Sequence, residues 1–319
     1  MTARRSLCNR VPILFIAAVA FLLSGCHRAD QQKKLIAIIV PSEDNPYFKT
    51  EADAAAARAI ALGYRVRVDS HNDDAYQQDN LVDAAIASNA AALILDNAGT
   101  DASISAVRRA AKAGIAVFLI DREIAANGLA KAQIVSDNDQ GARLVAREFA
   151  HILRGKGNYA ELLGRESDTN AQIRTRGFHA ILDEDPGLHL VASQSANWSA
   201  EEAFQKTETI LQAHAELDGI IAGNDTMAVG AAAAAKSAGR PNIKITGFDG
   251  SPDALEAIRS GQIQATVLQP AVYISDLAID EADRYLHTGS TGKPERQSIP
   301  CDLVTIANVN DFRNFEKIR

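Results

Sequence analysis

Short runs of isoleucine, valine and leucine recur along the chain at spacings of roughly 24 to 31 residues, and each is followed by an alanine-rich helical pattern. A strand, a crossover helix and the next strand together take about 30 residues, so this spacing predicts successive βαβ units. Strands joined in this way are parallel and need helices on both faces, which predicts an α/β fold with two parallel-sheet lobes. The runs begin near Leu35, Tyr64, Ala91, Ile115, Asn158, His189, Gly219 and Ile243.

The helical segments carry their own boundary signals. Ser199 and Glu202 have the spacing of a capping box, in which each side chain bonds the backbone at a helix N-terminus. Gly63 and Gly239 follow alanine-rich segments and are expected just past helix C-termini. Alanine favours helices and lets them pack closely on a sheet, so we interpret the alanine tracts as packing surfaces.

The start of the chain has the pattern of an export signal. Arginines precede an apolar run at 11–23, which is shorter than the roughly 20 residues that span a bilayer as a helix. The run ends in Leu-Ser-Gly-Cys at 23–26, which resembles the bacterial lipobox, where the cysteine is acylated and the peptide is cut before it. We therefore expect a lipoprotein signal peptide at 1–25, lipidation at Cys26 and a polar tether at 26–34. The alternative is ordinary secretory cleavage, with Cys26 incidental.

Composition excludes several functional classes. The formal net charge of −7 is the opposite of a nucleic-acid footprint. Of three cysteines, Cys8 would leave with the leader and Cys26 would be lipidated, which leaves Cys301 as a small buried thiol and allows no disulfide in the mature domain. No zinc-ligand spacing, dinucleotide-binding glycine motif or hydrolase nucleophile motif occurs. We therefore expect neither a metal, a cofactor nor an enzyme, and we expect the histidines in solvent or capping positions.

Polar residues gather where the apolar runs end. Ligands of open parallel sheets bind beyond the carboxyl ends of the strands, so such residues face any ligand crevice. For a single Asp or Asn, a loop or helix-cap role is the simpler interpretation, and Arg122 beside a carboxylate could form a surface ion pair. The set as a whole favours a site. It includes Asn45, Asp121, Arg122, Asn224, Asp249 and Gln269.

Several motifs, in order, resemble those of type I periplasmic sugar-binding proteins, especially the ribose, allose and galactose group of ABC-transporter receptors. The resemblance runs from about Leu35 to Val304 and implies doubly wound lobes joined by three crossings, which close on a sugar. It implies lobes of 35–136 plus 270–302, and of 137–269 plus 303–319. The motifs are Asn45-Pro46-Tyr47-Phe48, Asp121-Arg122, Ser136-Asp137-Asn138, Arg174-Thr175-Arg176-Gly177-Phe178, Asn224-Asp225-Thr226-Met227-Ala228, Gly247-Phe248-Asp249-Gly250 and Gln269.

The residue types suit a sugar, whose ring has apolar faces and a hydroxyl edge. Tyr47 and Phe48 from the first lobe and Trp198 from the second would sandwich the ring. The family pattern selects Arg174 rather than Arg176. Phe248 is included as a ligand contact, and core packing is the alternative interpretation of Tyr47, Phe48 and Phe248. The polar rim would comprise Asn45, Asp121, Arg122, Arg174, Asn224, Asp249 and Gln269.

Departures from the ribose receptors change the expected ligand. Pro41 stands where those proteins carry a hydroxyl residue, Tyr47 adds a hydroxyl and Trp198 is bulkier than the expected phenylalanine. We expect a pentose, a hexose or a small polyol such as a tetritol rather than ribose. The resemblance implies a monomer, lipid-anchored in the cell envelope, that delivers its ligand to an ABC permease. The alternative is a sensory sugar or quorum-signal receptor that presents its closed form to a membrane partner.

Overall fold

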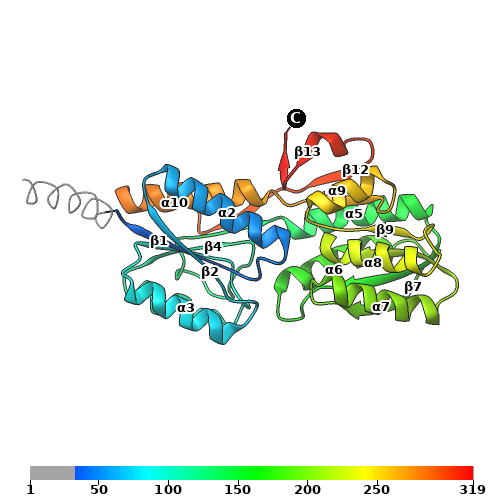
Figure 1. The fold of residues 1–319 in the computed structure, drawn as a ribbon, viewed down its shortest axis with the longest axis horizontal. Helices are drawn as coiled ribbons and strands as arrows, with labels where there is room; N and C mark the ends of the chain where they lie inside the picture. The colour runs from blue at the N-terminus through cyan, green and yellow to red at the C-terminus, as the bar shows by residue number, and fades with distance from the viewer. Residues whose placement is uncertain (1–32, 319) are drawn as a thin grey trace, which may run out of the picture.

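The computed structural model describes residues 33–318, so the expectations for the leader and Cys26 lie outside the described residues. Two α/β lobes lie side by side (Figure 1). The sheet of the first lobe has the strand order β11-β5-β4-β3-β1-β2, and all its neighbours are parallel. Its strands are β1 Leu35–Val40, β2 Arg65–Ser70, β3 Ala92–Leu95, β4 Ala116–Ile120, β5 Ala132–Ser136 and β11 Arg296–Ile299, and its helices are α2 Pro46–Ala61, α3 Ala75–Ala87, α4 Ile104–Lys112 and α10 Ala271–Thr288.

The sheet of the second lobe has the order β12-β10-β9-β8-β6-β7. It repeats the parallel pattern of the first, except that its edge strand β12 runs antiparallel to β10. Its strands are β6 Gly157–Leu163, β7 Leu188–Ser195, β8 Leu217–Ala222, β9 Lys244–Thr246, β10 Ala265–Leu268 and β12 Asp302–Thr305, and its helices are α5 Asn138–Leu153, α6 Thr169–Leu182, α7 Ala200–Ala213, α8 Asp225–Ser237 and α9 Pro252–Arg259.

The predicted α/β fold is confirmed, and the apolar runs become the strands β1 to β4 and β6 to β9. Alternation along β1 shows why helices cover both faces. Ile36 and Ile38 belong to the core under α2 and α10, whereas Ala37 and Ile39 belong to the core under α3 and α4. Successive side chains of a strand point to opposite faces, so an apolar strand needs a helical layer on each side.

The helix-boundary signals also correspond to real ends. The Ser199 hydroxyl accepts a hydrogen bond from the backbone N–H of Glu202 at 3.3 Å, at the start of α7. Gly63 and Gly239 follow the C-caps of α2 and α8 and have φ values of +91° and +70°, the left-handed region that glycine adopts without steric cost.

The chain passes between the two sheets three times. It leaves the first sheet after β5, returns between β10 and α10, and leaves again between β11 and β12. The last segment contains a short helix, η1 Val309–Asp311, and a hairpin of β13 Phe312–Arg313 and β14 Glu316–Lys317. This C-terminal hairpin lies over the junction of the lobes, with β13 against α9 and β14 against α10 (Figure 1).

Two further properties of the described residues concern membrane-spanning helices and the thiol of Cys301. Within 33–318, no helix combines the length and apolar character needed to cross a membrane. Cys301 is buried, as expected, and burial raises the pKa of its thiol to about 12.

Candidate functional site

A cavity lies between the lobes, where the carboxyl ends of both sheets meet. In each sheet the strand order reverses about its first strand, β1 or β6, and such switch points are where open α/β sheets bind ligands. The cavity is lined by aromatic, charged and amide side chains from both lobes, the mixture of groups expected of a small-molecule site. Its lining residues are Asn45, Tyr47, Phe48, Asp121, Arg122, Asp168, Asn170, Arg174, Trp198, Asn224, Asp249 and Gln269.

The structure brings together all but one of the side chains predicted from the sequence, and that each binds a ligand stays a prediction. Asp168 and Asn170 also line the cavity and were missed by the sequence analysis. Both lie between the end of β6 and the first turn of α6, so the rule of polar residues after a strand would have found them.

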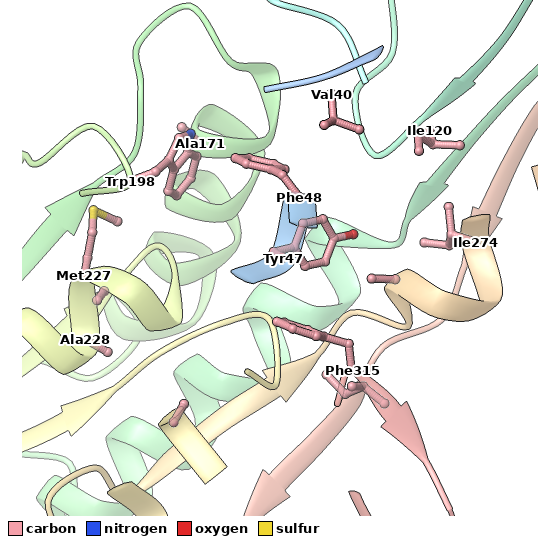
Figure 2. Packing of buried hydrophobic residues seen from close by; sticks show 14 of the residues in the cluster. Val40, Tyr47, Phe48, Ile120, Ala171, Trp198, Met227, Ala228, Ile274 and Phe315 are labelled. Atoms are coloured by element: carbon pink, nitrogen blue, oxygen red, sulfur yellow. The ribbon is translucent and has the colours of Figure 1, made fainter. Parts of the chain in front are cut away.

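The first residues of α2 form the aromatic wall of the first lobe (Figure 2). Asn45 caps the helix, because its Oδ1 accepts a hydrogen bond from the backbone N–H of Tyr47 at 3.0 Å. Tyr47 and Phe48 pack edge to face, with ring centroids 5.8 Å apart. The Tyr47 hydroxyl donates to Oδ1 of Asp121 at 3.4 Å. This long contact connects the start of α2 to the residue that follows β4.

Arg122 lies at the centre of a buried acidic cluster. Its Nη1 donates to Oδ1 of Asp73 at 2.8 Å, and its Nε lies 2.9 Å from Oδ2 of Asp168. Two further carboxylates, Asp96 and Asp121, lie 3.5 and 3.9 Å from Nε. The guanidinium is only 3% exposed, and buried charges persist only when they are paired in this way.

The carboxylates of this cluster are buried, and burial disfavours their charged form. Burial raises the pKa of Asp121 to about 6, although the Arg122 guanidinium opposes the shift. Burial also raises the pKa of Asp96, and that of Glu51 behind it, well above their ordinary values. Both of these carboxyls are fully buried. Repulsion from neighbouring carboxylates acts in the same direction as burial, while the Arg122 guanidinium opposes both by lowering the pKa of Asp96 and Glu51.

His71 borders the same cluster and corrects an expectation. It is fully buried rather than exposed to solvent. Its Nε2 lies 2.8 Å from the carbonyl of Asp96, and its Nδ1 accepts a hydrogen bond from the backbone N–H of Asp73 at 3.1 Å. This pattern fits the neutral ring, which has one donor and one acceptor.

Two of the cavity residues missed by the sequence analysis connect the lobes. Asp168 pairs with Arg122 across the junction, and Nδ2 of Asn170 donates to the backbone carbonyl of Asp121 at 3.1 Å. Outside the cavity, Nη1 of Arg165 lies 3.2 Å from Oδ2 of Asp73. These contacts show that the lobes are closed over the cavity.

Arg174 on α6 is anchored within the second lobe. Its Nε donates to Oδ1 of Asn138 at 2.8 Å, and its Nη1 donates to the carbonyl of Gly223 at 2.8 Å and to Oδ1 of Asp249 at 3.3 Å. Burial raises the pKa of Asp249, while Arg174 opposes the shift. Since three different elements hold the guanidinium, its orientation is set before any ligand arrives.

Phe248 is the predicted ligand contact that does not line the cavity. Its ring is fully buried and its centroid lies 3.9 Å from the guanidinium carbon of Arg174. A flat cation stacks well on an aromatic face. The structure therefore favours core packing, the alternative for Phe248, because its ring supports Arg174 in the core of the second lobe.

Trp198 forms the aromatic wall of the second lobe (Figure 2). Its Nε1 donates to Oδ2 of Asp168 at 3.2 Å. The indole packs closely on glycine backbone, because a Cβ on Gly164 would be 2.0 Å from its ring and one on Gly223 would be 3.1 Å away. The guanidinium carbon of Arg174 also lies 5.4 Å from the centroid of the ring. Glycines after β6 and β8 thus leave the space that the tryptophan occupies.

Strained backbone concentrates at this site. Asp121, Trp198 and Asp249 have φ values of +56°, +65° and +127°, a region that residues with a Cβ rarely adopt. Such strain persists where the surrounding structure fixes it, and it is common at ligand sites. The three positions aim two carboxylates and the indole at one cavity from different strand ends.

Buried polar atoms in the cavity lack protein partners. Oε1 of Gln269 and Nη2 of Arg122 have no hydrogen-bond partner among the described residues, whereas Nε2 of Gln269 donates to Asp249 at 2.8 Å. Buried groups of this kind cost stability unless a partner satisfies them. Nε of Arg122, which faces Asp168 as an ion pair, also has no hydrogen-bond partner among the described residues. Free donors and a free acceptor on residues that line the cavity fit a small molecule with hydroxyl groups.

Comparison with known proteins places this geometry in context. The sequence model of the periplasmic binding protein domain matches residues 36–291. The chain is 55% identical over 300 residues to the D-apiose import binding protein of Paraburkholderia graminis, which covers 94% of this chain and 96% of that protein. It is 49% identical over 304 residues to the protein of the same name from Actinobacillus succinogenes, which covers 95% and 98%.

A solved structure of a related protein has the same fold. An ABC-transporter periplasmic solute-binding protein from Actinobacillus succinogenes, with bound D-allose, superposes with a TM-score of 0.82 at 30% identity. The superposition covers 88% of this chain and 100% of that one. The two proteins therefore share the whole two-lobed architecture.

Proposed function

The chain belongs to the periplasmic binding protein domain family and is the sugar- or polyol-binding component of an importer, and we propose that its ligand is D-apiose. Both relatives that carry this ligand in their names are similar over nearly the full chain. D-apiose is a branched five-carbon sugar whose ring form is a small furanose rich in hydroxyl groups.

One observation carries the proposal. The closed cavity between the lobes combines aromatic walls from both lobes with carboxylate, guanidinium and amide groups. Carboxylates accept hydrogen bonds from hydroxyls while guanidinium and amide groups donate to them, and the rings cover apolar faces. Charge-assisted hydrogen bonds contribute about 1.5–3 kcal/mol each, so a few of them account for micromolar affinity near −8 kcal/mol.

Capture follows from the arrangement of the lobes. We assign 35–136 with 270–301 to the first lobe and 137–269 with 302–318 to the second, because β12 begins at Asp302 in the second sheet. The ligand bridges them by binding Asn45, Tyr47, Phe48, Asp121 and Arg122 on one side and the residues of the second lobe on the other. Since its contacts to both lobes exist only when they are closed, the ligand favours the closed form. The protein acts by binding and release, without catalysis.

The ligand is tested by a binding screen. Purified protein freed of endogenous sugar is titrated with D-apiose, D-ribose, D-allose and myo-inositol in a calorimeter, with thermal shifts recorded in parallel. D-apiose at about 100 times its dissociation constant should stabilise the native state by about 2.7 kcal/mol by mass action. Tighter binding of any other compound, or no heat with D-apiose, would refute the assignment.

The same proposal includes a place for the protein outside the cytoplasm. We infer that Cys26 carries a lipid, that the tether at 26–34 connects it to the first lobe, and that the monomer serves an ABC permease at the membrane. Cys26→Ser should remove the acyl mass and the partitioning into detergent, because a lipid chain rather than a helix provides the anchor. Mass spectrometry of material from cells decides this. An unacylated N-terminus in the parent protein would contradict it.

A further inference from the structure

The loop of the C-terminal hairpin carries an aromatic residue where glycine would be least strained. Phe312 pairs with Lys317 and Arg313 with Glu316, which leaves Asn314 and Phe315 as a two-residue loop. Their φ values are +51° and +60°, as such hairpin turns require, and asparagine followed by glycine is the usual choice. A bulky residue in the left-handed region is an outlier that calls for a reason.

The position of the ring supplies that reason. Phe315 is fully buried, and its ring meets the ring of Tyr47 edge to face, with centroids 5.5 Å apart and planes at 84°. Figure 2 shows Phe315 reaching toward Tyr47 from the hairpin. Tyr47 lines the cavity and Phe315 does not, so Phe315 supports the tyrosine from outside the space of the ligand.

Within the buried cluster around Tyr47, its side chain makes one hydrogen bond and two aromatic pairs with the described residues. The hydroxyl reaches Asp121 only at 3.4 Å, which is long for a hydrogen bond between oxygens. The remaining aromatic neighbour is Phe48, on the next residue of the same helix. Phe315 is therefore the one aromatic neighbour of Tyr47, among the described residues, that another part of the chain provides.

The hairpin is well placed to hold this ring. It rests on α9 of the second lobe and on α10 of the first, and α10 packs beside α2, which carries Tyr47. Nζ of Lys317 also pairs with Oδ1 of Asp302, just after the last crossing, at 2.9 Å. The ring of Phe315 thus enters the core where the two lobes meet.

We propose that Phe315 is a positioning residue for the sugar site, which sets the orientation of Tyr47 and through it the affinity for the ligand. The binding measurement that tests this inference rests on the proposed function, because it uses D-apiose as the ligand. Edge-to-face aromatic pairs contribute enough that losing one should raise the dissociation constant about 2- to 12-fold.

The test compares two substitutions in the same hairpin. Phe315→Gly keeps the turn conformation and removes the ring, whereas Phe312→Ala removes a buried ring that forms no aromatic pair with Tyr47 among the described residues. Phe315→Gly should raise the dissociation constant for D-apiose roughly fivefold. Phe312→Ala should lower the melting temperature yet leave affinity within about twofold. An equal loss of affinity in both variants, or in neither, would overturn the proposal.

A spectroscopic measurement reports on Tyr47 without any sugar. The protein is labelled with fluorotyrosine, and the Tyr47 resonance is identified by its absence in Tyr47→Phe. In the ligand-free state Phe315→Gly should shift or broaden this resonance, and Phe312→Ala should leave it in place. If the parent protein bound no D-apiose, the proposed function would fail while this spectrum still decided the role of Phe315.

Folding of the variant is controlled by a milder change. Phe315→Leu keeps most of the buried volume but loses the aromatic edge. It should fold even if Phe315→Gly does not, and it should perturb the Tyr47 resonance in the same direction. An unchanged resonance and affinity in Phe315→Leu would mean that the residue only fills space.

Discussion

Each lobe contributes one buried arginine to the cavity, and the two are held in different ways. Arg122 of the first lobe is surrounded by carboxylates, one of which, Asp168, belongs to the opposite lobe. Arg174 of the second lobe is held by an amide, a backbone carbonyl and a single carboxylate, with Phe248 stacked on it. One arginine neutralises charge and the other is fixed by directional hydrogen bonds.

The two arginines therefore have different roles, because Arg122 contributes to closure of the lobes and Arg174 to recognition of the ligand. Arg122 makes its contact with the second lobe only when the lobes are closed, and it compensates carboxylates that would otherwise repel one another. Arg174 keeps its contacts inside its own lobe, so its orientation does not depend on closure. We therefore expect loss of Arg122 to destabilise both the fold and the closed state, and loss of Arg174 to affect mainly the binding of the ligand.

Arg122→Ala should have the largest effect. It leaves several buried carboxylates without their cation, and breaking a buried ion pair from one side costs about 3–5 kcal/mol. The unfolding free energy in urea should fall by that amount, and sugar binding should be lost as well. Arg109→Ala, which removes an arginine paired with carboxylates at the surface, should change stability by about 1 kcal/mol or less. A comparable change in the two variants would contradict the charge-neutralising role.

Arg174→Ala should abolish measurable sugar binding while the protein stays folded. The substitution removes a preset donor, which leaves sugar hydroxyls unpaired in a closed cavity and Asp249 with Gln269 as its remaining side-chain partner. Calorimetry should show a rise in the dissociation constant of about 100-fold or more, with a smaller loss of stability than Arg122→Ala. Unchanged affinity would mean that Arg174 does not bind the ligand, and the proposed difference in role between the two arginines would then be wrong.

Trp198→Ala tests the aromatic wall of the second lobe. Loss of its apolar contact should cost about 1–3 kcal/mol, a roughly 5- to 150-fold rise in the dissociation constant. Because this is the single tryptophan of the chain, its fluorescence should also change on ligand binding, and iodide should quench it less. Both signals should titrate together. A lower melting temperature with affinity within twofold of the parent would make Trp198 structural.

Gly164→Ala moves the same indole without deleting it. The added methyl would overlap the Trp198 ring, and the glycine backbone has no positive φ that would itself resist alanine. The ring must shift toward the cavity, so affinity should fall roughly 3- to 10-fold and the tryptophan emission should change in the ligand-free protein. Gly99→Ala, whose new methyl makes ordinary contacts, is the matched control. An effect of the same size there would refute the steric explanation.

The sequence predicted the strands that open βαβ units, because each has a compact apolar run at regular spacing. It did not predict β5, β11 and β12 as strands. β5 follows β4 through a loop without a helix, which breaks the spacing. β11 and β12 are short strands at the sheet edges with several polar residues, so neither has the signal of a buried strand.

The site was largely predictable for a related reason. Residues after strand ends must meet at the switch point of a parallel sheet, so position along the chain implies position in space. Phe248 shows the limit, since a strand end does not reveal which side chain faces the cavity and which turns into the core. Phe315 lies far from any such motif, and only the path of the chain brings it to Tyr47.

One histidine in each lobe extends the comparison to pH. Burial lowers the pKa of His71 in the first lobe to about 4. Hydrogen bonding to Glu161, helped by Asp183, raises the pKa of His179 in the second lobe to about 9. The ring of His71 accepts a backbone N–H and would lose that bond on protonation, whereas both ring nitrogens of His179 face carboxylates.

These opposite shifts predict opposite pH dependences of stability, relative to an unfolded pKa of about 6.5. The contribution of His71 is present above 6.5 and is lost as pH falls toward about 4. That of His179 is present below 6.5 and is lost as pH rises through about 9, and its exposure limits it to about 1 kcal/mol. Urea unfolding from pH 5 to 9 should show His71→Gln flattening the acid side and His179→Gln the alkaline side. If the unfolding free energies of the parent and the variants changed with pH in parallel, neither histidine would have the shifted pKa that its surroundings imply. The electrostatic difference between the lobes would then be limited to the two arginines.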